Sequence, residues 1–256
     1  VVRAPGTTDA VVFSLMHFAT SLGKSAIEVR DSRGFVVNRV LMPYVNEAIL
    51  LVNEGLDIAE VDGVMRRFGM SVGPLEMVDQ VGLDVAAHVA REMEPAFGDR
   101  FAPNPTFQRI ASSGWLGVKR GAGFYRYRGT KKLKVNKDVL PLLRVDPPAH
   151  AAQFQRLPSA VRLAQARERM VLLTVNEAAA CLGEQLAADA QMIDLAMILG
   201  AGWAPHRGGP LRYADTRGPR DVVTALRELE ASLGPRFRPC AELTRRADAG
   251  TPFYPA

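Results

Sequence analysis

The sequence predicts a mainly helical protein, in which two helical units of one plan follow a short helix and a strand. Apolar residues recur at intervals of three and four over most of the chain, the spacing of a buried helix face. Val45-Asn46-Glu47-Ala48 returns as Val175-Asn176-Glu177-Ala178, at a distance of 175 − 45 = 130 residues. Gly73-Pro74-Leu75 returns as Gly209-Pro210-Leu211, at a distance of 209 − 73 = 136 residues. Two such echoes in the same order predict tandem structural units.

Composition excludes several classes of protein. A chain of 256 residues with 48% hydrophobic content can build one large core or two smaller ones. No apolar run approaches about 18 residues without a charge, so no membrane span is expected. Cys181 and Cys240 are the only cysteines and lack metal-ligand spacing, which favours a reducing, cytoplasmic location and no metal site. The net charge of +5 favours an anionic partner.

The first 30 residues predict one helix and one strand. Residues 9–22 carry Val12, Leu15 and Met16 on one face, and Gly23 ends the pattern. Residues 25–30 alternate like a strand, but a lone strand exposes two unpaired edges. No G-x-G-x-x-G follows an apolar strand anywhere, so the phosphate-binding turn of a dinucleotide site is missing. The beginning is therefore expected to be part of a larger domain.

The longest helical pattern follows Gly34. Asn38 and Arg39 stand in its first turn, where backbone amides without an intrahelical partner favour an anionic or carbonyl-bearing ligand. Pro43 lies inside the pattern and should bend the helix. Such a helix suits the presentation of its first turn to a ligand. The alternative is an ordinary core helix with a solvated Asn38, which the pattern alone favours.

Shorter helices are expected next. Asp57 caps one, with Glu60 at the capping-box position. A turn ending at Pro74 precedes helical patterns over residues 75–82 and 83–93. Pro103-Asn104-Pro105 then introduces a helix over residues 106–113. Four methionines could line a groove for an apolar ligand, although core filling is the simpler expectation: Met65, Met70, Met77 and Met93.

Glycines space the segment from Gly114 to Tyr125, which favours a turn that packs Phe124 and Tyr125 into the core over a phosphate cradle. Residues 128–157 are then expected to form a basic linker. The charge run around its start is most simply a solvated face, with attraction for a polyanion as the sharper alternative. Its members are Arg126, Arg128, Lys131, Lys132, Lys134 and Lys137.

The segment Asp31-Ser32-Arg33-Gly34-Phe35-Val36-Val37-Asn38-Arg39, continuing to Pro43, resembles the start of the C-terminal helical domain of the 3-hydroxyacyl-CoA dehydrogenase family. The resemblance implies that Asn38 contacts the substrate beside a catalytic His, and that Ser32 is the candidate cofactor contact, with helix capping as its simpler role. It also implies that residues 1–30 are the last part of an NAD-binding Rossmann domain, whose catalytic His and Glu lie outside the chain.

The second half points to one branch of this family. Trp203 to Gly218 resembles a segment of the multifunctional α-subunit of the bacterial fatty-oxidation complex, whose members also carry an enoyl-CoA hydratase domain. The second copy lacks the Gly-Phe-Val-Val-Asn motif, and Arg167-Glu168-Arg169-Met170 stands there instead. It is therefore expected to lack the catalytic Asn and to act as scaffold.

These observations predict four segments and one favoured function. The segments are a Rossmann remnant (1–30), a first helical dehydrogenase C-terminal domain (31–127), the basic linker (128–157) and a degenerate helical repeat (158–256). The favoured function is the acyl-CoA-binding part of an NAD-dependent L-3-hydroxyacyl-CoA dehydrogenase of fatty-acid β-oxidation, with a thiolase subunit as a possible partner. A stand-alone module that binds acyl-CoA or pairs with a subunit is the alternative. A basic nucleic-acid binder is disfavoured, because few aromatics interleave the charges.

The four histidines are weak catalytic candidates. His17 and His88 lie on helical patterns, His150 lies in the basic linker, and His206 has no partner at a recognisable spacing. Each is expected to be structural or solvated.

Overall fold

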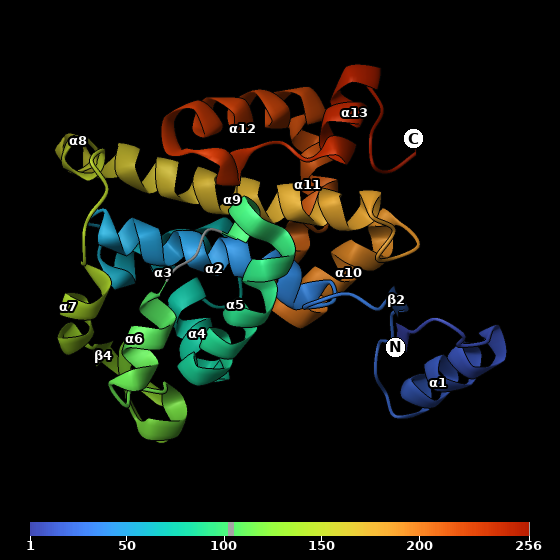
Figure 1. Cartoon of the computed structure of the whole chain (residues 1–256), viewed down its shortest axis with the longest axis horizontal. Coiled ribbons are helices and arrows are strands. Elements are labelled where there is room, and N and C mark those ends of the chain that lie inside the picture. Colours follow the sequence, from blue (N-terminus) through green and yellow to red (C-terminus); the bar gives the residue numbers. More distant parts are fainter. Residues whose placement is uncertain (102–104, 256) are drawn as a thin grey trace. The chain divides into compact units, whose positions relative to one another are not determined.

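The computed structural model in Figure 1 describes residues 1–101 and 105–255, without the side chains of Glu94 and Asp99. It is mainly helical, which confirms the predicted fold class. Within the described part of the chain, no helix combines the length and the apolar composition needed to cross a membrane. Contacts divide the chain into two compact units. We call Val1–Leu41 with Thr174–Ala256 the split unit, and Met42–Leu173 the central unit.

The split unit begins with a small β-α-β arrangement. Strand β1 (Val2–Arg3) pairs in parallel with strand β2 (Val29–Arg30), and helix α1 (Asp9–Ser21) connects them. The helix agrees with the prediction for residues 9–22. The strand prediction was wrong in two respects: β2 is shorter than residues 25–30, and it has a partner. A two-residue strand carries too little alternation to be seen in a sequence.

Helix α1 buries only part of the face that its spacing predicts. Val12 is 3% exposed, whereas Leu15 is 46% exposed. Its other large apolar side chains are exposed too: Val11, Phe13 and Phe18. The apolar pattern predicted the helix correctly, because periodicity sets the local conformation whether or not a covering surface is present in the chain.

Helix α2 (Val37–Asn53) follows, with Pro43 inside it, and α9 (Ser159–Gly183) is the other long helix (Figure 1). The boundary between the two units falls inside both helices, after Leu41 and after Leu173. Each long helix therefore supplies residues to both units. The predicted segment boundaries at residues 30, 127 and 157 follow the sequence repeat and not these compact units, and they stay a prediction.

The central unit contains helices α3 (Ile58–Phe68), α4 (Pro74–Val81), α5 (Leu83–Phe97) and α6 (Thr106–Ser112). The predicted capping box is confirmed, because Asp57 and Glu60 both make their reciprocal contacts at the start of α3. Pro103 and Asn104, which were expected to introduce α6, lie outside the described residues. Three of the four methionines are buried, with exposed fractions of 0–5%, and fill the core: Met65, Met70 and Met93.

The expected linker is an ordered part of the central unit. Strand β3 (Tyr125–Arg128) pairs antiparallel with β4 (Lys131–Val135), and helices α7 (Leu140–Leu143) and α8 (Ala151–Arg156) follow. Three apolar side chains in this segment are buried: Val139, Leu143 and Phe154. Charge and proline content suggested a linker because these anchors are widely spaced among polar residues.

The split unit continues with the end of α9 and with helices α10 (Ala190–Ala201), α11 (Pro210–Arg217), α12 (Pro219–Leu233) and α13 (Ala241–Ala249). Helices α12 and α13 pack against each other (Figure 1). Trp203 is fully buried between α10 and α11 in the sequence. As in the central unit, a proline stands at the first residue of the helix that follows the Gly-Pro-Leu turn.

A buried carboxylate organises each Gly-Pro-Leu turn. Asp62 accepts hydrogen bonds from the backbone amides of Leu75 and Glu76, at 2.8 and 3.1 Å, and from the hydroxyl of Tyr125 at 2.7 Å. A Cβ atom on Gly73 would lie 2.3 Å from the Cβ of Asp62, so only glycine fits there. The turn is therefore fixed by a side chain from the preceding helix.

The same arrangement occurs in the second half of the chain. Asp194 accepts from the amides of Leu211 and Arg212, at 2.8 and 2.9 Å, and from the hydroxyl of Tyr254 at 2.7 Å. A Cβ atom on Gly209 would lie 2.2 Å from the Cγ of Asp194.

A second carboxylate in each half holds the aromatic end of its segment. Asp79 accepts from the amides of Phe124 and Tyr125, and Asp215 accepts from those of Phe253 and Tyr254. These matching contacts support our proposal that the two halves follow one plan.

Candidate functional site

The first turn of helix α2 is preceded by an unusual backbone conformation. Gly34 has φ 74° and Phe35 has φ 48°, so two successive residues are in the left-handed region. Glycine adopts this region freely, whereas a bulky residue such as phenylalanine is strained there. The amide of Phe35 donates to the carbonyl oxygen of Ser32 at 3.0 Å and closes the turn. The chain thus enters α2 through a tight, strained bend.

Asn38 is the second residue of α2, and its side chain is exposed. The described residues include no hydrogen-bond partner for its side-chain amide. The amide can both donate and accept, and it does not titrate. Asn38 is therefore available to a polar ligand, as the sequence predicted for a first-turn residue.

A cavity of about 240 Å³ lies beside Asn38 in the split unit. Asn38 supplies a polar group to a lining that is otherwise largely apolar: Val1, Val2, Ile27, Val29, Gly34, Phe35, Val36 and Val37. Phe35, 44% exposed, contributes a ring to this edge. Such a lining suits a small apolar group that carries one hydrogen-bonding atom.

Ser32 lies near this cavity in the sequence but is not part of its lining. It is partly exposed, and its carbonyl oxygen closes the turn to Phe35. Ser32 therefore has an observed role in the backbone turn before α2. Its predicted contact with a cofactor stays a prediction, and so does its hydroxyl as a helix cap.

Arg39, the neighbour of Asn38, points into the protein and is fully buried. Its Nε donates to Oε1 of Glu177 at 2.6 Å, and its two terminal nitrogens donate to both oxygens of Glu184, at 2.7 and 2.8 Å. Burial alone would lower the pKa of Arg39, but the hydrogen bonds with Glu184 and the charge of Glu177 raise it. Arg39 is therefore a charged anchor and not a ligand-binding side chain.

Arg169 forms a matching cluster in the central unit. It is 2% exposed, and its Nε donates to Oε1 of Glu47 at 2.5 Å. Its terminal nitrogens donate to both oxygens of Glu54, at 2.6 and 2.7 Å. Adding 130 to Arg39, Glu177's counterpart Glu47 and Glu54 gives Arg169, Glu177 and Glu184. The sequence held this signal, but the prediction used the echo of Glu47 alone.

His150 is the histidine with the most notable surroundings. Its Nε2 lies 3.0 Å from Oε1 of Glu54, and its side chain is 34% exposed. Since Glu54 is already engaged by Arg169, His150 extends a structural cluster. The prediction that it is structural or solvated agrees with this position.

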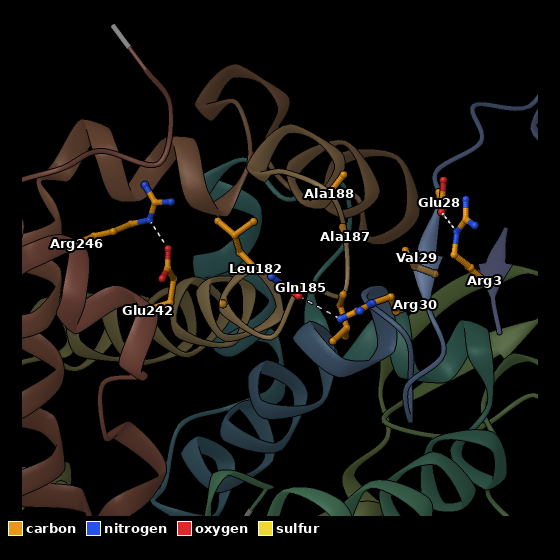
Figure 2. Close-up of a pocket in the computed structure, with 12 residues that line it drawn as sticks. Arg3, Glu28, Val29, Arg30, Leu182, Gln185, Ala187, Ala188, Glu242 and Arg246 are labelled. Carbon is orange, nitrogen blue, oxygen red and sulfur yellow. Dashed lines mark hydrogen bonds and ion pairs between the residues drawn. The ribbon is translucent and has the colours of Figure 1, made fainter. Parts of the chain in front are cut away.

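A larger cavity, of about 610 Å³, lies elsewhere in the split unit (Figure 2). Its charged side chains engage partners within the lining: Arg3 pairs with Glu28, and Arg246 with Glu242 at 2.6 Å. Arg30 donates to the amide oxygen of Gln185 at 3.3 Å. Neither Asn38 nor Ser32 lines it. This cavity is thus separate from the site that the sequence predicted.

Comparison with known proteins confirms the predicted family resemblance. Residues 34–127 match the family model described as the C-terminal domain of 3-hydroxyacyl-CoA dehydrogenase. This match begins at the strained turn before α2 and ends within the β3–β4 hairpin, so it includes Asn38. It covers the first of the two halves that share matching contacts.

Two solved structures extend the likeness over nearly the whole chain. One is 3-hydroxybutyryl-CoA dehydrogenase from Escherichia coli K12, with 25% identity, a TM-score of 0.77, and coverage of 97% of this chain and 66% of that one. The other is the dehydrogenase part of multifunctional enzyme 1 from C. elegans, with 23% identity and a TM-score of 0.66. That match covers 95% of this chain and 55% of the other, and it shows the fold alone.

The chain thus spans less than two thirds of the length of these relatives. Among the described residues, the β1–α1–β2 arrangement has no glycine-rich cradle for a dinucleotide, since Ala4-Pro5-Gly6-Thr7-Thr8 follows β1. The residues present do not by themselves form a cofactor site. No chemical step through a cofactor is therefore derived from this chain.

Proposed function

We propose that the chain supplies the acyl-CoA-binding helical region of an NAD-dependent 3-hydroxyacyl-CoA dehydrogenase that acts in fatty-acid β-oxidation. The observation that carries the proposal is the family match over residues 34–127, together with an exposed Asn38 beside a mostly apolar cavity. The multifunctional branch and a thiolase partner are part of the proposal, supported by the fold match to a multifunctional enzyme. NAD would be held largely by residues that are not in this chain.

The proposed role of Asn38 follows from its chemistry. Oxidation of a 3-hydroxyacyl group converts a hydroxyl oxygen into a carbonyl oxygen, and negative charge develops on that oxygen when the proton leaves first. A neutral amide donor aimed at this oxygen stabilises the charge without changing its own protonation state. Asn38 would hold and orient the oxygen, and a base supplied by the rest of the enzyme would remove the proton.

Binding and turnover separate this proposal from the alternatives. Acetoacetyl-CoA is titrated into the isotopically labelled 256-residue chain, and the side-chain amide signal of Asn38 is followed by NMR. The expected result is a saturable shift of that signal, with a smaller shift for free coenzyme A. Absence of any shift at millimolar ligand would contradict the proposal, and a response to random duplex DNA alone would favour the nucleic-acid alternative.

Turnover gives the second arm of the test. With 3-hydroxybutyryl-CoA and NAD, the 256-residue chain is expected to produce no NADH, because it lacks a base and a dinucleotide cradle. The same chain within a complete enzyme should produce NADH. Robust NADH formation by the purified chain alone would overturn this division of roles.

A further inference from the structure

Asn38 and Arg39 are adjacent in sequence but differ completely in environment. Asn38 is exposed at the 240 Å³ cavity, and Arg39 is fully buried. Successive helical residues are rotated by about 100°, so fixing one side chain fixes where its neighbour points. The orientation of Asn38 therefore depends on what holds Arg39.

Two carboxylates from the second half of the chain hold Arg39. Glu177 lies on α9, and Glu184 directly follows the end of that helix. The guanidinium is planar, and its paired contact with both oxygens of Glu184 fixes orientation as well as distance. A point charge could not define the rotation of the helix in this way.

Close packing restrains the same turn from a third element. A Cβ atom on Gly200, in α10, would lie 3.0 Å from Cγ2 of Val37. The first turn of α2 is therefore in contact with α10 through Val37 and with α9 through Arg39. Residues far away in the sequence restrain both neighbours of Asn38.

We propose that Arg39 is a positioning residue, and that Glu177 and Glu184 act through it to aim Asn38 at the cavity. The inference rests on the proposed function for the role of Asn38. It gives the second half of the chain a part in the site beyond that of scaffold: its α9 sets the geometry of a ligand-contacting residue that it does not itself carry.

The chain offers a matched control in the cluster of Arg169. Glu177 and Glu47 are both nearly fully buried, and each accepts a hydrogen bond from the Nε of its arginine, at 2.6 and 2.5 Å. Glu177→Gln and Glu47→Gln therefore remove the same charge from equivalent surroundings. Glu47 even lies on α2, the helix that carries Asn38, whereas Glu177 does not.

The test uses the full labelled chain and compares global stability with local signals. Both variants are expected to lower the melting temperature by a similar amount. Only Glu177→Gln should shift the side-chain amide signal of Asn38 and raise exchange of the Val40 amide, by about tenfold or more relative to the rest of α2. Arg39→Lys keeps the charge without the planar contact, and should give an intermediate shift.

Two results would overturn the inference. One is a Glu177→Gln variant that melts earlier but leaves the Asn38 signal unchanged, and the other is an equal Asn38 shift in Glu47→Gln. If Glu177→Gln does not fold, Glu184→Gln decides by the same readouts, because the Glu184 side chain is 46% exposed and its loss is milder. An unchanged Asn38 signal in that variant would also overturn the inference.

Ligand binding separates failure of this inference from failure of the proposed function. If the unmodified chain does not bind acetoacetyl-CoA, the proposed function fails, while a selective Asn38 shift still supports positioning. If the unmodified chain binds and Glu177→Gln binds equally well with an unmoved Asn38, positioning fails alone. The expected result is binding weakened about tenfold in Glu177→Gln, the loss of one well-made hydrogen bond.

Discussion

The clusters of Arg39 and Arg169 have the same composition but different neighbours. Each buried arginine contacts two glutamates, spaced seven residues apart, with closely similar distances. Beside Arg39 stands Asn38, exposed at a cavity, whereas Glu168 occupies the equivalent place beside Arg169. The comparison teaches that the interior of the two halves has been kept while the residue presented outward has changed. A fold can keep its internal ion pairs and still carry a polar ligand group on only one side.

The clusters also differ in enclosure. The side chain of Glu184 is 46% exposed, whereas that of Glu54 is 1% exposed. His150 and Gln155 approach Glu54, and the ring of Phe154 lies 5.8 Å from the guanidinium carbon of Arg169. The cluster of Arg169 is therefore the more desolvated of the two, and its charges depend more on one another.

The largest difference between the halves should be catalytic. In the complete enzyme, Asn38→Ala is expected to lower kcat by about 10- to 1,000-fold, roughly 1.4–4 kcal/mol of barrier, because it removes a donor to the developing charge. Glu168→Ala, at the equivalent place, should leave kcat nearly unchanged. Steady-state kinetics with 3-hydroxybutyryl-CoA and NAD measures both.

Folding has to be checked in these variants by thermal unfolding. Asn176→Ala is a useful third variant, also expected to leave kcat nearly unchanged. It is a demanding control, because Asn176 donates to the carbonyl of Arg238 and accepts from the amide of Cys240, both at 2.8 Å. Equal, small kinetic effects from well-folded Asn38→Ala and Glu168→Ala would mean that Asn38 is only structural.

The next difference concerns stability. Glu54→Gln is expected to lower the free energy of unfolding by about 3 kcal/mol or more, because it leaves a buried arginine with too little compensating charge. Glu184→Gln should cost about 1 kcal/mol or less, because solvent reaches this carboxylate. Chemical denaturation of both variants measures the two values. A cost for Glu184→Gln that matches that of Glu54→Gln would remove the distinction between an enclosed and an open cluster.

The sequence predicted the helices well and the internal contacts poorly. Helix α1, the capping box at Asp57 and the helix after Gly34 follow from local patterns of three to five residues. The strands β1 and β2 were missed or overextended, because a two-residue pairing depends on a distant partner. The fully buried Arg39 was interpreted as a ligand-facing residue, since a charged residue at a helix start is usually exposed.

The candidate site shows the same division. The exposure of Asn38 and the cavity beside it agree with the prediction from the motif around Gly34. What positions Asn38 could not be read from local patterns, because Glu177 and Glu184 lie about 140 residues away, within range of a comparison such as the 130-residue repeat but not of helical periodicity.

The smallest difference is expected at the carboxylates that hold the two Gly-Pro-Leu turns. Burial raises the pKa of Asp62 and of Asp194 from 3.8 to about 6, although the tyrosine and backbone hydrogen bonds act in the opposite direction. Because the folded pKa exceeds the unfolded one, each group binds more proton in the folded state between these values. Its contribution to stability is present below about pH 4 and is lost as the pH rises through about 6.

Carbon NMR of the two carboxyl groups between pH 3 and 8 measures this directly. Both signals should titrate near pH 6 with closely similar midpoints, if the two turns follow one plan. A midpoint near 4 for one carboxyl group and near 6 for the other would show that their surroundings differ in charge or hydration despite matching contacts. Because each group accepts two backbone amides and one tyrosine hydroxyl, a split of that size would have to arise from charges outside these three donors, such as Arg66 near Asp62 or Arg212 near Asp194.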